Sequence, residues 1–454
     1  MMISPVETRY KVEELERFLS QESFIFAMLE YERVYLTTLM EFIGKKEKIG
    51  EVNKRFKSME QDSGFLKQVR DGEKKTKHDV RALVNVIQSY LPDDLKSYVH
   101  LGITSYDVVD SVKALMYKKA FTEVIIPDMV TLERRLIELA EEHADTIQIG
   151  RTHGQHAVPI TFGFAVANYV SRFGNSIERL IQTVSELNGK CSGAVGAYNA
   201  LSLLVGDPVR LEKKVLMKLG LYAEEISNQI VQPERFTRLV SECVVAFGVL
   251  NDFANDMRQL QRTEISEVCE AVESEQVGSS TMPHKRNPIS WENVCSLYRV
   301  ALGYALTSFL NQESEHQRDL RNSASQRFYS EFFMLFDYAI RRMIYGIKRL
   351  QVSTERMKSN ANLSSSFIAE PLYVLLAKKG DAEAHKKVQE AARAGKLDAL
   401  ISHLPEEERK FIIGIKEDSS HYIGLSTELT KKVCTRWREK LNTSPICFYA
   451  KKSF

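Results

Sequence analysis

The segment from Gly278 to Pro288 carries the densest set of residues that could do chemistry, and it reads Gly-Ser-Ser-Thr-Met-Pro-His-Lys-Arg-Asn-Pro. Gly278 allows backbone conformations that bring N–H groups close to a ligand, and Ser279 and Ser280 add two hydroxyls. Pro283 and Pro288 restrict the chain around three basic residues and an amide. Such a loop suits an anionic substrate whose negative charge grows during the reaction. A solvated surface loop is the alternative interpretation of Gly-Ser-Ser taken alone.

A second cluster reads Gly-Arg-Thr-His-Gly-Gln-His and spans residues 150–156. His153 and His156 are three residues apart, a spacing that can place both side chains on one helical face, as in some metal sites. No Asp or Glu completes a known ligand set, and Gly154 separates the two histidines, so the pattern disfavours zinc. A histidine can instead serve as a general acid, because its unperturbed pKa of about 6.5 lies near physiological pH. A purely structural histidine is the alternative.

Three further groups of polar residues could bind a charged ligand. Residues 77–79 read Lys-His-Asp, for which a capping or surface role is the alternative. Thr104 and Asp107 have capping-box spacing, which predicts a helix start, and a helix N-terminus is a suitable seat for a carboxylate. Arginine forks grip phosphate through two parallel hydrogen bonds, and the third group contains two arginines with a serine between them. This third group, for which a solvated loop is the alternative, is Arg318, Ser323 and Arg327.

The loop from 278 to 288 closely resembles the signature loop of the fumarase/aspartase superfamily. Its Pro-His-Lys-Arg-Asn-Pro part is similar to that of adenylosuccinate lyases and of carboxymuconate cycloisomerases. In the superfamily a loop serine is the general base and a following lysine holds a substrate carboxylate, which implies these roles for Ser279 and Lys285. The stretch from 150 to 159 resembles a second conserved region of the superfamily. In adenylosuccinate lyases the histidine that matches His153 is the general acid.

Matches to the adenylosuccinate lyase pattern continue from Arg9 to Arg327, and they imply a set of substrate-binding residues. The arginine, serine and arginine of the third group have the spacing with which that family grips the nucleotide phosphate. Three positions depart from the family pattern. Lys77 replaces an arginine and loses its bidentate fork, Leu101 replaces a common aromatic residue, and Trp291 stands where a small residue is common. The implied binding residues are Arg9, Tyr10, Lys77, His78, Asp79, His100, Thr104, Ser105, Thr152, Gln229, Lys285, Asn287, Glu292, Arg318, Ser323 and Arg327.

The resemblance to adenylosuccinate lyases implies two β-eliminations that release fumarate. Adenylosuccinate would give AMP, and the succinylcarboxamide ribotide SAICAR would give AICAR. The reaction implied needs no metal and no organic cofactor. Two alternatives stay open at this point. One is a carboxymuconate cycloisomerase, against which the residues matched to a nucleotide site count, and the other is a non-catalytic helical scaffold.

The elements that must position these residues are predicted to be long helices. Prolines are few, and they fall between segments with apolar residues at helical spacing. Pro127 is expected to interrupt the helix that starts near Thr104, and Pro233 to stand in the first turn of another helix. The longest predicted helices span 161–188, 289–311 and 323–347.

These helices predict an all-α fold of three helical domains, because long amphipathic helices are stable only when they pack together. The expected domains are 1–104, a central long-helix bundle with the signature loop at 105–350, and 351–454. The apolar faces of the bundle need partners, which smaller flanking domains could supply. The resemblance implies instead a homotetramer that pools its central helices and shares its active sites between subunits.

The composition excludes several other classes of protein. The chain has 62 Lys and Arg against 60 Asp and Glu, a net charge of +2, which argues against a nucleic-acid-binding protein. Its 6 cysteines form no Cys-x-x-Cys pair, which favours reduced thiols in a cytosolic protein. The first ten residues contain no signal or transit pattern, and no long apolar run is present. We therefore expect a cytoplasmic protein that does not cross a membrane.

Overall fold

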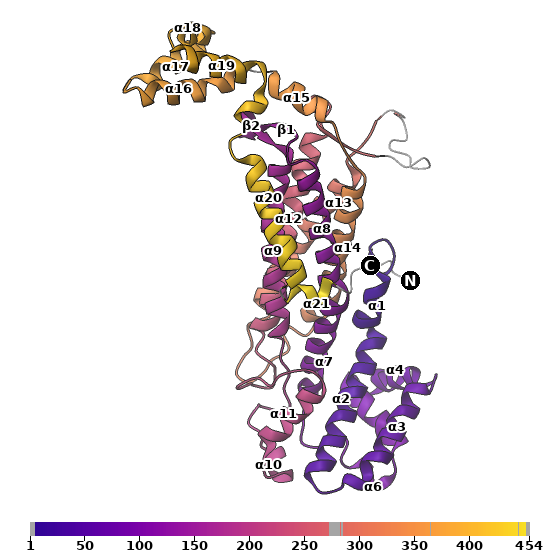
Figure 1. Ribbon diagram of the computed structural model, residues 1–454. Coiled ribbons are helices and arrows are strands. Elements are labelled where there is room, and N and C mark those ends of the chain that lie inside the picture. Colours follow the sequence, from indigo (N-terminus) through magenta and orange to yellow (C-terminus); the bar gives the residue numbers. More distant parts are fainter. Residues whose placement is uncertain (1–4, 272–281, 283–284, 364, 444, 451–454) are drawn as a thin grey trace.

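The computed structural model describes residues 5–271, 282, 285–363, 365–443 and 445–450. Long helices form most of the described chain, which confirms the all-α prediction (Figure 1). Figure 1 shows an elongated molecule, with a bundle in the middle, N-terminal helices beside one end and small C-terminal helices at the other. Two short antiparallel sheets, which the sequence analysis did not predict, are also present. They pair β1 (Ile147–Thr152) with β2 (Gln155–Thr161), and β3 (Val268–Glu270) with β4 (Leu350–Val352).

The N-terminal helices form a group beside the bundle. Ser20 separates the first two helices, and its side chain caps the second by accepting a hydrogen bond from the Ser23 N–H at 3.1 Å. Lys77 ends a helix in the left-handed conformation, and His78 begins the next. The elements are η1 (Pro5–Glu7), α1 (Glu13–Leu19), α2 (Gln21–Phe42), η2 (Lys46–Lys48), α3 (Ile49–Gln61), α4 (Phe65–Thr76), α5 (Asp79–Tyr90) and α6 (Asp93–Lys96).

The prediction that Pro127 interrupts the first bundle helix is wrong. The π-helical segment η3 (Phe121–Ile125) joins α7 (Ser105–Ala120) to α8 (Ile126–Glu142), so residues 105–142 form one helical rod. Pro127 lies in the first turn of α8, where the wider hydrogen-bonding pattern of the preceding segment tolerates a residue without an N–H. At 1.5 Å per residue this rod is roughly 57 Å long.

The remaining bundle helices agree with the predicted segments. Pro233 immediately precedes one of them as its N-cap. Apolar side chains from α7, α8 and the other long helices form one continuous core. These helices are α9 (Phe162–Ser185), α12 (Glu234–Leu260), α13 (Ile289–Leu310) and α14 (Tyr329–Lys348), and shorter pieces between them are α10 (Leu201–Leu204), α11 (Pro208–Lys218) and η4 (Ser325–Phe328).

The C-terminal part divides into two structural groups. Helices α16 to α19 have a small core of their own, which includes Leu372, Ile412 and Ile415. Helix α20 instead returns along α8 and α9 of the bundle, so the predicted boundary near residue 350 does not separate all later residues from it. The division into three domains stays a prediction. The elements are α15 (Thr354–Asn362), η5 (Ser365–Ile368), α16 (Ala369–Lys378), α17 (Ala384–Arg393), α18 (Leu397–Ser402), α19 (Glu406–Glu417), η6 (Ser419–Tyr422), α20 (Ser426–Thr443) and α21 (Ile446–Ala450).

The six cysteines are free, and four of them are buried. Among the helices of the described ranges, none combines the length and the apolar character needed to cross a membrane.

Candidate active site

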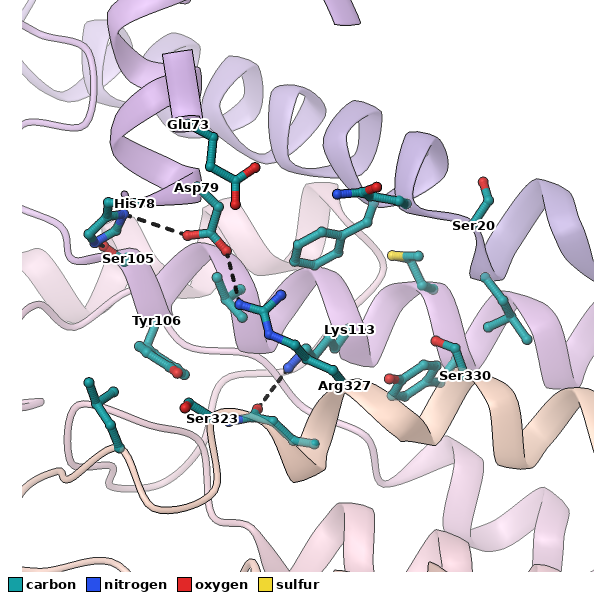
Figure 2. Close-up of a pocket in the computed structure, with 18 of the residues that line it drawn as sticks. Ser20, Glu73, His78, Asp79, Ser105, Tyr106, Lys113, Ser323, Arg327 and Ser330 are labelled. Atoms are coloured by element: carbon teal, nitrogen blue, oxygen red, sulfur yellow. Dashed lines mark hydrogen bonds and ion pairs between the residues drawn. The ribbon is translucent and has the colours of Figure 1, made fainter. Parts of the chain in front are cut away.

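A cavity of about 530 Å³ opens between the α1–α2 elbow, the α4–α5 turn, α7 and the residues around η4 (Figure 2). Six of the predicted binding residues line this cavity although they are far apart in the sequence. Their side chains come from three separate segments that meet only in the fold. The six are Lys77, His78, Asp79, Ser105, Ser323 and Arg327.

The α4–α5 turn presents the first three of these residues. Lys77 has a φ of 53°, a conformation that costs energy for a residue other than glycine and that often marks functional sites. His78 caps α5, because its Nδ1 accepts a hydrogen bond from the Arg81 N–H at 3.3 Å. Its Nε2 lies 3.3 Å from the Ser105 Oγ, so the turn is joined to the start of α7.

The start of α7 is fixed by a buried carboxylate, which confirms the capping box predicted at Thr104. The Asp107 Oδ2 accepts hydrogen bonds from the Thr104 N–H at 2.8 Å and the Gly193 N–H at 3.1 Å. Its Oδ1 pairs with the Lys190 ammonium, and both side chains are completely buried. Because this carboxylate is held by charge and by backbone donors, the N-terminus of α7 and Ser105 beside it are rigidly placed.

The two arginines of the third group have different environments. Arg327 is exposed, and its Nη2 lies 3.8 Å from the Asp79 Oδ2 (Figure 2). Arg318 stacks on the Tyr106 ring at 4.3 Å, donates to the Tyr106 hydroxyl at 2.5 Å, and donates to the Asn322 Oδ1 at 2.7 Å. Arg327 therefore faces the cavity, whereas Arg318 lies behind Tyr106 and outside the cavity wall.

His100 lies just before the start of α7, outside the cavity lining, and has a φ of 58°. Its Nδ1 is 2.6 Å from the Oε1 of Glu32, a carboxylate that is almost fully buried. Burial lowers the pKa of His100, but the charge and hydrogen bond of Glu32 outweigh it and raise the pKa above its ordinary value. His100, close to the cavity end of α7, therefore holds a proton more readily than a free imidazole does.

Several cavity residues were missed by the sequence analysis. Tyr106, Val109, Lys113 and Met116 follow one another along the cavity face of α7 at helical spacing, and Gln326 lies opposite. The one signal for them in the sequence is Lys113, a single lysine within an otherwise apolar helical stripe. A lysine in such a stripe is usually taken to lie at the solvent-exposed edge of the helix. Only the packing of the η4 segment against α7 shows that this edge is covered.

The predicted catalytic histidine lies in a different part of the molecule. Strands β1 and β2 form a hairpin in which Thr152 pairs with Gln155. His153 and Gly154 make the two-residue turn, with φ values of 53° and 74°, as a tight hairpin turn requires. The helical face considered for His153 and His156 is therefore wrong, since both residues belong to an exposed hairpin. Thr152 and His153 project from its tip.

This hairpin is held by a buried carboxylate near β3. The Glu267 Oε2 accepts hydrogen bonds from Gln148 Nε2 at 3.0 Å and from Arg151 Nη1 at 3.1 Å. Glu270 and Ser290, which precede and follow the stretch that contains the signature loop, are joined by a hydrogen bond from the Ser290 N–H at the start of α13 to the Glu270 Oε2 at 3.0 Å. Lys285 and Glu292 are exposed there, and Asn287 is partly buried.

Ser279, the predicted general base, lies outside the described residues, as do Gly278, Ser280 and His284. Two other predicted groups can be placed. The Gln229 N–H donates to the Gln317 carbonyl at 3.2 Å, close in sequence to Arg318. Arg9 is exposed before α1. The centroids of the Tyr10 and Tyr338 rings lie 5.1 Å apart in an edge-to-face contact with α14, away from the cavity and from the hairpin.

Apart from Arg9, Tyr10 and Gln229, the predicted residues that the structure describes lie in two groups, at or near opposite ends of the rod of residues 105–142 (Figure 1). The cavity group adjoins Ser105 at one end, and the hairpin group adjoins β1 beyond the other. The rod between them is roughly 57 Å long, so one chain does not bring the two groups together. The described residues contain no cluster of three or more His, Cys, Asp or Glu side chains that could hold a metal ion.

Comparison with known proteins defines the class first. Residues 46–303 match the family model described as lyase, and residues 314–407 match the model of the adenylosuccinate lyase C-terminal region. The fold is similar to fumarate lyase from Mesorhizobium sp. BNC1, with a TM-score of 0.81, 21% identity and coverage of 94% of this chain and 98% of that one. It is also similar to 3-carboxy-cis,cis-muconate lactonizing enzyme from Pseudomonas putida, with a TM-score of 0.80, 22% identity and coverage of 96% and 99%. The helical bundle and matched regions define a lyase of the fumarase/aspartase superfamily.

The sequence comparison is more specific than the fold. This chain is 36% identical over 450 residues to adenylosuccinate lyase from Pyrococcus abyssi, covering 95% of this chain and 97% of that protein. The chain belongs to the adenylosuccinate lyase family.

Proposed function

We propose that this protein cleaves adenylosuccinate to AMP and fumarate, and SAICAR to AICAR and fumarate. The observation that carries this proposal is the cavity at the α4–α5 turn. It gathers six of the residues that match the nucleotide site of the family, including Arg327 and Ser323 for the phosphate. The similarity to the muconate enzyme concerns the fold at 22% identity, so it gives no support to that chemistry.

The reaction is a β-elimination. Ser279 takes the proton from the substrate carbon beside a carboxylate, and the electron pair left behind forms the new double bond as the C–N bond breaks. Before that bond breaks, negative charge gathers on the carboxylate, where Lys285 and Asn287 stabilise it. His153 gives a proton to the leaving nitrogen, which departs with the nucleotide. Serine is a poor base in water, so this role requires cationic surroundings and exclusion of solvent.

The nucleotide would bind at the cavity end. Arg327 and Ser323 donate hydrogen bonds to the phosphate, and the carboxylate of Asp79 suits the ribose hydroxyls. The α7 N-terminus, with Thr104 and Ser105, offers donors to a substrate carboxylate. In this arrangement the succinyl group lies at the edge of the cavity beside the α7 N-terminus and faces whatever chain carries the hairpin and the signature loop.

We infer that the active site is shared between subunits of a homotetramer in the cytoplasm. Two observations support sharing. The cavity group and the hairpin group lie at opposite ends of one rod, so a site that contains both needs more than one chain. In addition, α13 exposes five apolar side chains in the single chain, which another subunit would cover. These five are Val300, Leu302, Leu306, Phe309 and Leu310.

The direct test is fumarate release from adenylosuccinate, followed as an absorbance change with purified protein. We expect turnover with adenylosuccinate and with SAICAR, and none with 3-carboxymuconate. The variant His153→Ala, purified in the same way, controls for contaminating lyase. A protein that turns over only 3-carboxymuconate would be a cycloisomerase. A folded oligomer inactive on all three compounds would favour the scaffold alternative.

A further inference from the structure

Lys113 is a cation that no matched motif includes, yet it lines the candidate nucleotide cavity. It lies on α7, eight residues after Ser105, on the same face as Val109 and Met116. Its side chain is partly buried against this apolar face, and its ammonium extends toward the segment that carries Ser323 and Arg327 (Figure 2).

The ammonium has a neutral hydrogen-bond partner. The Lys113 Nζ donates to the Gln326 Oε1 at 2.7 Å, and among the described residues this is its one hydrogen bond. An ammonium has three donors, so two remain for a ligand. Because Gln326 is uncharged, the positive charge of Lys113 is not neutralised by this contact.

Hydrogen bonds link Lys113 to the residues around Arg327. The Gln326 Nε2 donates to the Asn322 Oδ1 at 3.1 Å, and Asn322 also accepts from Arg318, which contacts Tyr106 on α7. This chain of contacts attaches the 318–327 segment to α7 at two points. The position of the Lys113 ammonium relative to Ser323 and Arg327 is therefore fixed before a ligand enters.

The charges around the cavity favour an anion. Lys77, Lys113 and Arg327 line it together with the carboxylates of Glu73 and Asp79. Glu73 and Asp79 come from the α4–α5 side, where Asp79 lies 3.8 Å from the exposed Arg327, whereas Lys113 lies on α7 and has Gln326 as its partner. A phosphate dianion placed between Lys113 and Arg327 would replace the neutral oxygen of Gln326 as the main partner of Lys113, and it would compete with Asp79 for Arg327.

The titration of Lys113 agrees with this geometry. Burial lowers the pKa of Lys113 to about 8, Asp110 and Asp79 oppose that change, and Arg327 and Arg318 add to it. Tyr106 and Tyr117 on α7, and Glu73, Lys77 and His78 at the α4–α5 turn, are the other titratable groups of the wall. Free Lys113 therefore loses its charge as the pH rises through about 8.

We propose that Lys113 is a binding residue for the phosphate group of the nucleotide, acting beside Ser323 and Arg327. This inference rests on the proposed function, because it places the nucleotide in this cavity. It adds a residue whose charge depends on pH to a subsite otherwise made of a permanent cation and a hydroxyl. Binding of the phosphate should therefore weaken with rising pH in a way that arginine at the same position would prevent.

The test compares AMP with adenosine by isothermal titration calorimetry, since the two differ only in the phosphate. Lys113→Met keeps the length and the apolar contacts of the side chain, and Lys113→Arg keeps the charge. Lys119→Met is the matched control, because Lys119 is exposed on the same helix and outside the cavity wall. At pH 7, we expect Lys113→Met to bind AMP roughly tenfold or more weakly and to bind adenosine as the wild type does.

The pH series separates a charge from a merely structural contact. Between pH 7 and pH 9, wild-type affinity for AMP should fall on the order of tenfold, as one proton is lost, and Lys113→Arg should stay nearly constant. The other titratable groups remain in Lys113→Arg, so a fall caused by them would appear there too. Such a fall would overturn the inference, as would wild-type AMP affinity in Lys113→Met or an equal loss for adenosine. If the wild type binds no AMP and releases no fumarate, the proposed function itself is wrong, and this inference is overturned with it.

Discussion

At the scale of single residues, the proposed chemistry depends on which hydroxyl of the signature loop takes the proton. Ser279 lies outside the described residues, so its role rests on the sequence and the family. We predict that Ser279→Ala leaves folding and AMP binding nearly intact and lowers turnover by about a hundred- to ten-thousandfold, the usual contribution of a positioned base. Steady-state fumarate release measures this loss.

Ser280 is the matched control for that experiment, since it is the same side chain one residue later. Ser280→Ala should keep most of the activity. The opposite outcome, with Ser280→Ala inactive and Ser279→Ala active, would show that the wrong hydroxyl has been named. Wild-type rates in both variants would exclude serine-base elimination for this protein.

The ion pair between His100 and Glu32 makes a pH-dependent contribution to stability. The pKa of His100 is raised in the folded protein, so its stabilisation is complete below the unfolded value of about 6.5 and is lost as the pH rises through the raised value. Glu32→Gln should therefore lower the free energy of unfolding most at pH 6, with a difference that narrows toward pH 8. Urea midpoints across this range measure it.

Glu30→Gln on the same helix provides the comparison. Glu30 pairs with Arg33, at 2.5 Å, and an arginine keeps its charge over this range. Its loss should change stability by the same amount at every pH. If Glu32→Gln shows the same flat difference, His100 does not titrate through its contact with Glu32.

At the scale of elements, the long helices were predictable because apolar residues at helical spacing and scarce prolines dominate the central sequence. The helices at 162–185 and 289–310 fall within the segments predicted for them. The hairpin at 147–161 was not predicted. Its turn places His153 in a left-handed conformation, which histidine adopts too rarely for the sequence to indicate it. The predicted break at Pro127 was wrong because the π-helical segment before it lets the helix continue through the proline.

The candidate site was predictable only in parts. Motifs identified Lys77, His78, Ser105 and Arg327, and the fold gathers them in one cavity. Lys113 has no motif, and only its contact with Gln326 reveals it. The sequence also could not show that His153 lies at the far end of the rod, because the position of His153 depends on how the predicted helices are joined in space.

Trp291 illustrates how two helices accommodate a residue that departs from the family pattern. It is fully buried on α13, and its ring covers Gly346 of α14, where an added Cβ would lie 2.6 Å from Trp291 Cη2. We predict that Gly346→Ala destabilises the protein by about 1–3 kcal/mol, as overpacking of a core usually does. The shift of the denaturant midpoint measures it.

Gly414→Ala is the control for this prediction. Gly414 lies inside α19, and a Cβ there would meet nothing within 4 Å. This substitution should be neutral or stabilising by up to about 1 kcal/mol, since alanine restricts the unfolded chain. Equal effects of the two substitutions would mean that the contact between Trp291 and Gly346 does not limit the packing of α13 on α14.

At the scale of the whole molecule, the apolar face of α13 is the feature that most requires a partner. Leu306 is 65% exposed in the single chain and lies in the middle of that face. We predict that Leu306→Glu reduces the mass measured by light scattering and abolishes fumarate release, because the shared site is lost with the oligomer. Phe411→Glu is the control, since Phe411 is 46% exposed on α19, outside the bundle, and its substitution should leave mass and activity unchanged.

A Leu306→Glu protein that is a fully active monomer would contradict sharing of the site. A tetramer of unchanged mass would instead show that α13 is not the face that associates. In that case the two groups would still have to meet through another surface, because the rod of residues 105–142 separates them in one chain.

The most direct test of the central claim, that the cavity group of one subunit and the hairpin group of another form one active site, is complementation between two impaired variants, assayed at a substrate concentration at which each alone is nearly inactive. His153→Ala removes the proposed acid at the hairpin, and Arg327→Ala removes the phosphate contact at the cavity. Mixed under conditions in which native mass spectrometry shows subunit exchange, the two should regain roughly a quarter of wild-type fumarate release, because that share of two-subunit sites contains both intact groups. Mixed oligomers that exchange fully and remain inactive would contradict the account.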